Sequence, residues 1–120
     1  MSTILIADDR IAGRDLARVV LEGCGYTVCE AANGRGALEL AQLAHPDLII
    51  LDLHMPDIDG FQVIAALRGD VEFVFTPILA LTASAMRGDR ERAMSAGFTG
   101  YMSKPMRLSE FRREVARLLA

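Results

Sequence analysis

Short apolar runs alternate with segments of helical spacing along the whole chain. The runs occupy residues 4–7, 26–29, 48–51, 78–81 and 98–102, and the second and fifth are the weakest. Apolar runs of this length, bounded by polar residues, are typical of strands that are buried on both faces of a sheet. The pattern therefore predicts five buried strands.

The segments between and after these runs predict five helices, because their apolar side chains recur every three or four residues. The apolar faces of the first, second and last helices lie within residues 12–23, 37–44 and 108–119. Asn33 is placed to cap the second helix, since a side-chain oxygen there can accept a hydrogen bond from the first turn. The third helix is expected to begin near Asp59 and to end at Gly69.

Strand and helix patterns that alternate in this way predict an α/β fold with a parallel sheet covered on both faces. Right-handed crossovers then produce an open, doubly wound sheet, for which the flavodoxin-like strand order 2-1-3-4-5 is expected. No linker or low-complexity tract interrupts the pattern, so we expect one domain over residues 1–120.

Two segments are less regular. Residues 85–97 predict a helix with an internal Gly88 and a thin apolar stripe, which we expect to be the least stable of the five. Residues 71–75 are mostly apolar and precede Thr76 and Pro77. They fit either a packed connection between elements or an exposed contact patch.

Composition excludes several classes of protein. The chain has 120 residues, of which 52% are hydrophobic, so it can bury a core without disulfides or metals. Its longest apolar runs are far shorter than the roughly 18 to 20 residues of a membrane span, and the N-terminus lacks a secretion signal. We therefore expect a cytoplasmic protein. Cys24 and Cys29 form no metal-binding motif and are expected to be reduced thiols.

Charge adds two observations. The net charge of −3 comes from 13 basic and 16 acidic residues, which argues against nucleic acid as a direct partner. Twelve of the basic residues are Arg, and Lys104 is the sole Lys. A general preference for Arg explains the twelve, but it leaves open why this position carries a compact ammonium rather than a guanidinium.

Polar side chains follow four of the predicted strands. Asp8 and Asp9 follow the first, Asp52 the third, Thr82 the fourth and Lys104 the fifth. In a doubly wound sheet, ligands bind beyond the carboxyl ends of the strands, where the winding direction reverses. We therefore expect these side chains to converge at one edge of the sheet.

Three carboxylates in one place repel one another, and a hard divalent cation relieves that repulsion. A site rich in carboxylate oxygens, with room for water, suits Mg²⁺. His45 and His54 are too isolated to indicate zinc. The alternative is that Asp8 and Asp9 only cap the following helix. A carboxylate beside Mg²⁺ can also attack phosphorus and form an acyl phosphate.

These residues resemble the receiver domain of two-component response regulators. The resemblance is carried, in order, by Asp8–Asp9, by Asp52 with Met55–Pro56 and Gly60, by Leu81–Thr82–Ala83, by Tyr101 and by Lys104–Pro105. It covers essentially the whole chain and is strongest with stand-alone receivers and with receivers of hybrid histidine kinases.

The resemblance implies a role for each site residue. Asp52 would accept the phosphoryl group, and Mg²⁺ would be bound by Asp52, by Asp9 directly, by Asp8 through water and by the backbone carbonyl of His54. Thr82 and Lys104 would contact phosphoryl oxygens. Tyr101 would move between exposed and buried positions.

Two further features follow from the same resemblance. Lys104–Pro105 would be a cis peptide, although the sequence alone favours trans. Arg10, His54 and Ser84 stand at positions that vary in the family and are thought to tune how fast phosphate leaves.

The implied function is a phosphorylation-operated switch rather than an enzyme. Phosphate on Asp52 would alter the surface formed by the fourth helix, the fifth strand and the fifth helix. The expected partners are a histidine kinase or histidine phosphotransfer protein and a downstream protein target. A phosphorelay intermediate, or the receiver piece of a hybrid histidine kinase, is the alternative.

We expect no membrane or nucleic acid partner, and either a monomer or a weak phosphorylation-dependent dimer. Acidic and basic side chains along residues 110–117 fit a dimer contact or, more simply, a solvated helix face. Because Met1 stands directly before the first strand, the chain is expected to be a complete protein or an N-terminal piece.

Two other functions use related folds. A haloacid dehalogenase-type hydrolase needs an acid two residues after its nucleophile, where this chain has His54. A flavodoxin-like FMN carrier needs neutral donors after the first strand, where Asp8 and Asp9 would repel phosphate.

Overall fold

Five parallel strands form one sheet in the order β2-β1-β3-β4-β5, as the sequence predicts. The structure is a computed structural model that describes residues 2–83 and 86–120. The strands are β1 (Thr3–Ala7), β2 (Thr27–Ala31), β3 (Leu48–Asp52), β4 (Ile78–Thr82) and β5 (Gly100–Ser103). Each strand begins and ends within two residues of the ends of the apolar run that predicted it. The winding direction reverses between β1 and β3.

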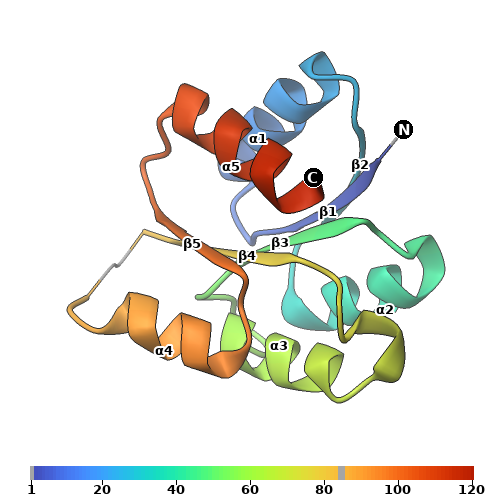
Figure 1. Cartoon of the computed structure of the whole chain (residues 1–120), viewed down its shortest axis with the longest axis vertical. Coiled ribbons are helices and arrows are strands. Elements are labelled where there is room, and N and C mark those ends of the chain that lie inside the picture. Colours follow the sequence, from blue (N-terminus) through green and yellow to red (C-terminus); the bar gives the residue numbers. More distant parts are fainter. Residues whose placement is uncertain (1, 84–85) are drawn as a thin grey trace.

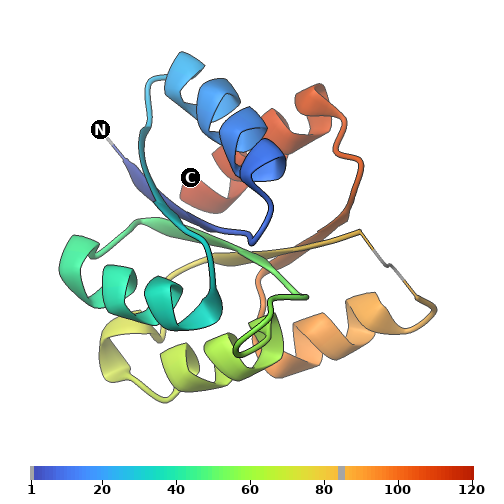
Figure 2. The ribbon, with the colours of Figure 1, turned by 180° about the vertical axis from the view of Figure 1, so that it is seen from behind.

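Helices cover both faces of this sheet (Figures 1 and 2). They are α1 (Ile11–Gly23), α2 (Gly34–Ala44), α3 (Gly60–Arg68), α4 (Asp89–Ala96) and α5 (Leu108–Leu119). A short 3-10 helix, η1 (Val71–Phe73), follows α3. The helices α1 and α5 lie on one face, and α2, α3 and α4 lie on the other. None of the helices in the part of the chain that the structure describes is long and apolar enough to span a membrane.

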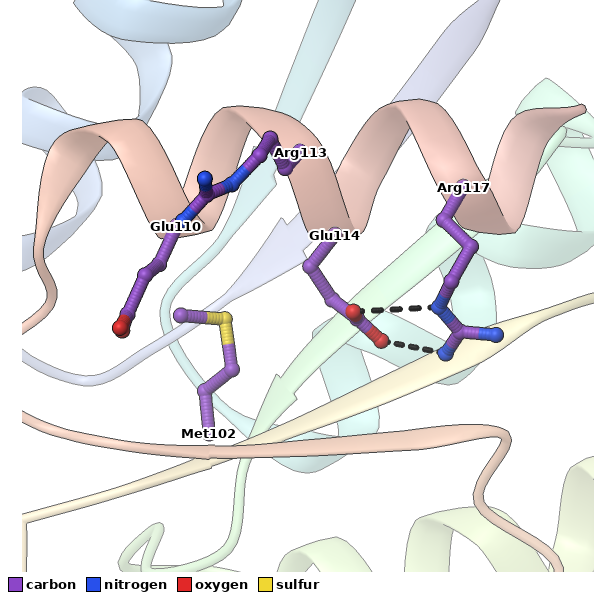
Figure 3. A pocket seen from close by; sticks show the side chains of 5 residues that line it. All are labelled: Met102, Glu110, Arg113, Glu114 and Arg117. Carbon is purple, nitrogen blue, oxygen red and sulfur yellow. Dashed lines mark hydrogen bonds and ion pairs between the residues drawn. The ribbon is translucent and has the colours of Figure 1, made fainter.

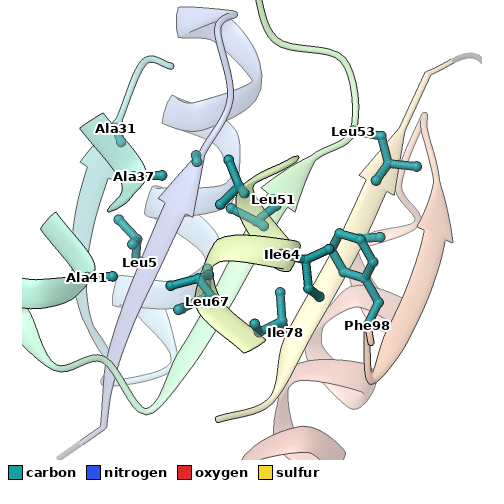
Figure 4. Packing of buried hydrophobic residues seen from close by; sticks show 14 of the residues in the cluster. Leu5, Ala31, Ala37, Ala41, Leu51, Leu53, Ile64, Leu67, Ile78 and Phe98 are labelled. Atoms are coloured by element: carbon teal, nitrogen blue, oxygen red, sulfur yellow. The ribbon is translucent and has the colours of Figure 1, made fainter. Parts of the chain in front are cut away.

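Alternating strand residues divide the core into two layers. Leu5, Leu51 and Ile78 pack with Ala37, Ile64 and Leu67 beneath α2 and α3 (Figure 4). Ile4, Ile6 and Ile50 pack instead with Leu21, Phe111 and Val115 beneath α1 and α5. Because successive side chains of a strand point to opposite faces, the central strands need apolar residues at every position.

The predicted helix ends are confirmed for α2 and α3. The Asn33 side chain accepts a hydrogen bond of 2.7 Å from the Gly36 N–H at the start of α2. Asp59 accepts from the Gln62 N–H, and the Gln62 side chain accepts from the Asp59 N–H, which together form a capping box. Gly69 is the C-cap residue of α3.

The predicted helix over residues 85–97 is wrong at its start. The helix α4 begins at Asp89, and Gly88 precedes it with φ of +87° rather than lying inside it. A left-handed residue cannot continue a right-handed helix, and glycine adopts that conformation at little cost. Asp89 and Ala93 are the buried residues of α4, so few side chains anchor this helix. Ser84 and Ala85 lie outside the described residues.

The connection between α3 and β4 is packed at one residue and exposed at others, so a contact patch there stays a prediction. Phe73 is buried in the core, whereas Val71 and Phe75 are 88% and 95% exposed. The Arg68 guanidinium organises this connection, donating to the carbonyls of Phe73 and Thr76 at 2.6 and 2.8 Å. It also donates twice to the Gly97 carbonyl, at 3.0 and 2.8 Å, at the end of α4.

Replacing Arg68 is therefore expected to destabilise the fold. Arg68→Met leaves several half-buried carbonyls without a donor, which should lower the free energy of unfolding by roughly 2–4 kcal/mol. Urea denaturation followed by circular dichroism measures the change. The exposed Arg112, replaced by Met in the same way, should leave stability unchanged. Equal stability of the two variants would contradict this role for Arg68.

Candidate functional site

The polar residues at the strand ends converge at the carboxyl edge of the sheet, as expected. Within residues 2–83 and 86–120, Asp8, Asp9 and Asp52 form the one group of three possible metal ligands, each offering an oxygen within 4.8 Å of the others. Asp8 and Asp52 are buried, whereas Asp9 is exposed. The β1 and β3 strands bring them together because they are neighbours in the sheet.

Lys104 lies between the two buried carboxylates. Its ammonium donates to Asp8 Oδ2 at 2.6 Å and to Asp52 Oδ2 at 3.0 Å. The side chain of Lys104 is only 18% exposed, so little solvent screens these contacts. A compact ammonium with three donors can contact two carboxylates and still have a donor left.

The site shifts the pKa values of Lys104 and Asp52. Burial lowers the pKa of Lys104, but the hydrogen bonds to Asp8 and Asp52 outweigh it, and the pKa is raised overall. Burial raises the pKa of Asp52, and the hydrogen bonds from His54 and Lys104 offset this only in part. Asp52 loses hydration and shares one ammonium with Asp8, so its negative charge is incompletely compensated.

The loop after β3 holds the second oxygen of Asp52. Asp52 Oδ1 accepts a hydrogen bond of 2.9 Å from the backbone N–H of His54. Asp52 opens onto a cavity of about 210 Å³ that is lined also by Asp9, His54, Ala83 and Lys104, together with Arg10. The cavity can therefore admit a small polar group beside the Asp52 carboxylate.

Asp8 does not cap α1 as the alternative reading proposed. The N-cap residue is Arg10, which makes no side-chain capping bond. Asp8 Oδ1 accepts from the Arg10 N–H at 2.9 Å, while Oδ2 faces Lys104. The carboxylate of Asp8 is thus oriented into the site.

Thr82 and Lys104 are held side by side by the sheet. Thr82 is fully buried at the end of β4, and its carbonyl accepts a 2.7 Å hydrogen bond from the Lys104 N–H. The Lys104–Pro105 peptide bond is cis, as the family resemblance implied. The trans bond that the sequence alone favoured is wrong.

Sequence reasoning missed two residues that shape this site. A Cβ at Gly13 would lie 2.9 Å from Asp8 Oδ2 and 3.9 Å from Lys104 Nζ. Arg14 donates to the backbone carbonyl of Asp8 at 2.8 Å. The signal for Gly13 was present in the sequence, because a glycine inside a helix costs about 1 kcal/mol relative to alanine.

A second surface lies at β5, between α4 and α5. Tyr101 is half-buried there and packs against the core beneath α3 and α4. Met102 projects toward α5 into a cavity of about 290 Å³, which is lined also by Glu110, Arg113, Glu114 and Arg117 (Figure 3). Arg117 pairs with Glu114 on the same helix. None of these described residues belongs to the carboxylate site.

The donor set of the carboxylate site fits a divalent cation such as Mg²⁺. Two buried carboxylates share one ammonium, and a third carboxylate borders the same cavity. Among the described residues, the group of possible ligands consists of three carboxylates and includes no imidazole or thiolate, which favours a hard cation over zinc. The exposed side of the cavity leaves space for water molecules or a phosphoryl group.

Comparison with known proteins agrees with this geometry. Residues 4–116 match the family described as the response regulator receiver domain. The polar-differentiation response regulator DivK of Brucella ovis is 37% identical over 109 residues, which is 91% of this chain and 89% of DivK.

Solved structures agree over the whole fold. The chemotaxis protein CheY4 of Vibrio cholerae superposes with a TM-score of 0.93 and 36% identity, covering 99% of both chains. The receiver domain of a sensor histidine kinase from Pseudomonas aeruginosa has a TM-score of 0.90 and 31% identity over 98% of this chain and 97% of its own. That structure is described with a magnesium ion coordinated in the active site cleft.

Proposed function

The chain belongs to the response regulator receiver domain family, and we propose from this that it is a signalling switch phosphorylated on Asp52. The observation that carries the proposal is the position of Lys104, whose ammonium contacts both Asp8 and Asp52 beside an open polar cavity. This arrangement holds a carboxylate nucleophile next to a cation that can neutralise a phosphoryl oxygen.

Asp9, Asp52 and the backbone carbonyl of His54 would bind Mg²⁺ directly, and Asp8 would bind it through water. When bound, the cation neutralises negative charge on the phosphoryl oxygens. The Pseudomonas aeruginosa receiver with magnesium in its active site cleft supports this assignment. The raised pKa of Asp52 supports it as well, because a buried carboxylate with incomplete compensation favours an added cation.

Transfer would proceed from a phosphohistidine. An Asp52 oxygen forms the new bond to phosphorus as the phosphorus–nitrogen bond breaks, and the electron pair of that bond stays with the donor imidazole. Lys104 and the Thr82 hydroxyl hold phosphoryl oxygens in place. The chain itself then has no activity beyond its own phosphorylation and dephosphorylation.

The signal would pass to the surface around β5. Thr82 and Lys104 follow the phosphoryl group, and this shifts the segment after β4 and the position available to Tyr101. The few buried side chains of α4 support this, because a weakly anchored helix needs little free energy to move. The phosphoryl group would shift populations between states that exist beforehand.

The partners would be a cytoplasmic histidine kinase or histidine phosphotransfer protein, and a downstream protein that reads the β5 surface. A phosphorelay intermediate uses the same chemistry but returns the phosphoryl group to another histidine. Transfer from the phosphorylated chain to a purified histidine phosphotransfer protein distinguishes the two functions.

Acetyl phosphate tests the proposal directly. With MgCl₂ present, the chain should gain about 80 Da in intact-mass spectrometry, the mass of one phosphoryl group. Hydroxylamine should remove the modification, because it cleaves acyl phosphates, and EDTA should prevent it. Failure to incorporate a phosphoryl group from either acetyl phosphate or a phosphorylated histidine donor would refute the proposed function.

A further inference from the structure

The loop between β3 and α3, residues 53–59, contacts both the Asp52 site and the start of α2. We refer to it as the β3–α3 loop. It has no regular secondary structure, yet it carries His54, whose N–H donates to Asp52 and which also lines the cavity. A small displacement of this loop would therefore alter the surroundings of Asp52.

Asp57 attaches this loop to α2. Its Oδ1 accepts the N–H of Gly34 at 2.9 Å, and its Oδ2 accepts the N–H of Arg35 at 2.9 Å. These hydrogen bonds, with that from Arg35 first, lower the pKa of Asp57 to about 2. Asn33 accepts the next N–H of the helix, from Gly36. Asp57 and Asn33 together therefore accept the N–H groups of three successive residues in the first turn.

The loop and α2 also approach each other closely. A Cβ at Gly34 would lie 2.4 Å from the Ile58 side chain and 2.5 Å from the Ile58 carbonyl. At the other end of the loop, a Cβ at Gly60 would lie 2.9 Å from the Asp52 carbonyl. Glycine at these two positions lets the loop pack directly against α2 and against the end of β3.

We propose that Asp57 is a positioning residue for the phosphorylation site. By fixing the β3–α3 loop to the start of α2, it keeps the His54 N–H on Asp52 and holds His54 beside the cavity. This inference rests on the proposed function, because it assumes that the cavity binds Mg²⁺. Asp57 itself contacts neither the cation nor the phosphoryl group.

Asp57→Ala and Asn33→Ala form a matched pair that tests the inference. Both variants remove side-chain acceptors from the first turn of α2, two oxygens of Asp57 in one and one oxygen of Asn33 in the other, and each should lower helix stability. Only Asp57→Ala frees the loop. It should weaken Mg²⁺ binding about tenfold in isothermal titration calorimetry, as loss of an outer partner of a metal ligand typically does. Asn33→Ala should bind Mg²⁺ like the wild type.

Hydrogen exchange of the His54 amide gives a readout without metal. In EDTA, this amide should exchange about tenfold faster in Asp57→Ala than in the wild type or Asn33→Ala. Asp57→Asn keeps one of the two acceptors, so it should be intermediate in both measurements, and it also serves if the alanine variant fails to fold.

The outcomes separate this inference from the proposed function. Wild-type affinity and wild-type exchange in both Asp57 variants would overturn the positioning role while leaving the function intact. Equal effects of Asp57→Ala and Asn33→Ala on Mg²⁺ affinity and on His54 exchange would mean that Asp57 only caps α2. That result would also overturn the positioning role. Absence of Mg²⁺ binding by the wild-type chain would instead count against the proposed function.

Discussion

Asp52→Asn is expected to incorporate no phosphoryl group, yet to fold at least as stably as the wild type in the absence of Mg²⁺. The amide cannot form an acyl phosphate, so the loss of incorporation is complete. Asparagine keeps the volume of the side chain and an oxygen that can accept the His54 N–H. The variant therefore loses the chemistry, a buried charge and the contact between the Asp52 carboxylate and the Lys104 ammonium.

The stability follows from the sign of the pKa shift. The pKa of Asp52 is raised in the fold, first by burial, so ionising this carboxyl at neutral pH weakens the folded state. That cost is present above the raised pKa and disappears as the pH falls through it. The free energy of unfolding of the wild type should therefore rise relative to that of Asp52→Asn as the pH falls from 7 toward the raised pKa.

Urea denaturation in EDTA at several pH values measures the stability, and intact-mass spectrometry after acetyl phosphate measures incorporation. Asp15→Asn, at an exposed position of α1, is the control and should be phosphorylated like the wild type. Wild-type incorporation by Asp52→Asn would mean that another residue accepts the phosphoryl group.

Lys104→Met should have opposite effects on metal binding and on phosphorylation. Mg²⁺ should bind more tightly, because the ammonium that contacts Asp8 and Asp52 no longer competes with the cation. Phosphorylation should slow roughly 10- to 100-fold, since a hydrogen bond to a charged group contributes about 1.5–3 kcal/mol. A general loss of structure would instead lower both the Mg²⁺ affinity and the rate of phosphorylation.

The same variant should be less stable without metal. Two buried carboxylates would face each other without a cation, which should cost about 3–5 kcal/mol at neutral pH. Added Mg²⁺ should restore most of this stability. Titration calorimetry, urea denaturation with and without Mg²⁺, and the rate of acetyl phosphate labelling measure the three effects.

Lys104→Arg is the matched control. It keeps the positive charge, so its stability should stay closer to that of the wild type than that of Lys104→Met. The planar guanidinium cannot reproduce a compact ammonium between two carboxylates, and phosphorylation should still slow. Labelling of Lys104→Met at the wild-type rate would exclude a role for Lys104 in the transfer.

Most of the fold could be predicted because its determinants are local. Each strand needs an apolar residue on both faces, and each helix needs one apolar stripe, so both periods are visible in the sequence. The caps of α2 and α3 were predictable for the same reason, since Asn33 and Asp59 bond to residues only three positions away. Even the convergence of Asp8 and Asp52 followed from a general rule of parallel sheets.

The failures occurred where a residue acts over a long sequence distance or through the backbone. Gly88 fits a helical pattern, and only its left-handed backbone reveals that α4 begins after it. Arg68 is one of twelve arginines, and its carbonyl partners lie as far away as Gly97. The sequence around Asp57 indicates only a turn, whereas its side chain accepts hydrogen bonds from Gly34 and Arg35, which are more than twenty positions away.

The sequence by itself determined the fold class, the strand order and the chemical identity of the site, because hydrophobic periodicity and the residues at strand ends are properties of short segments. Only the tertiary structure decided that Lys104 is shared by Asp8 and Asp52, and how the surrounding loops hold these groups. Such contacts join residues as many as 96 positions apart, and their geometry is set by packing of the whole sheet rather than by local preference.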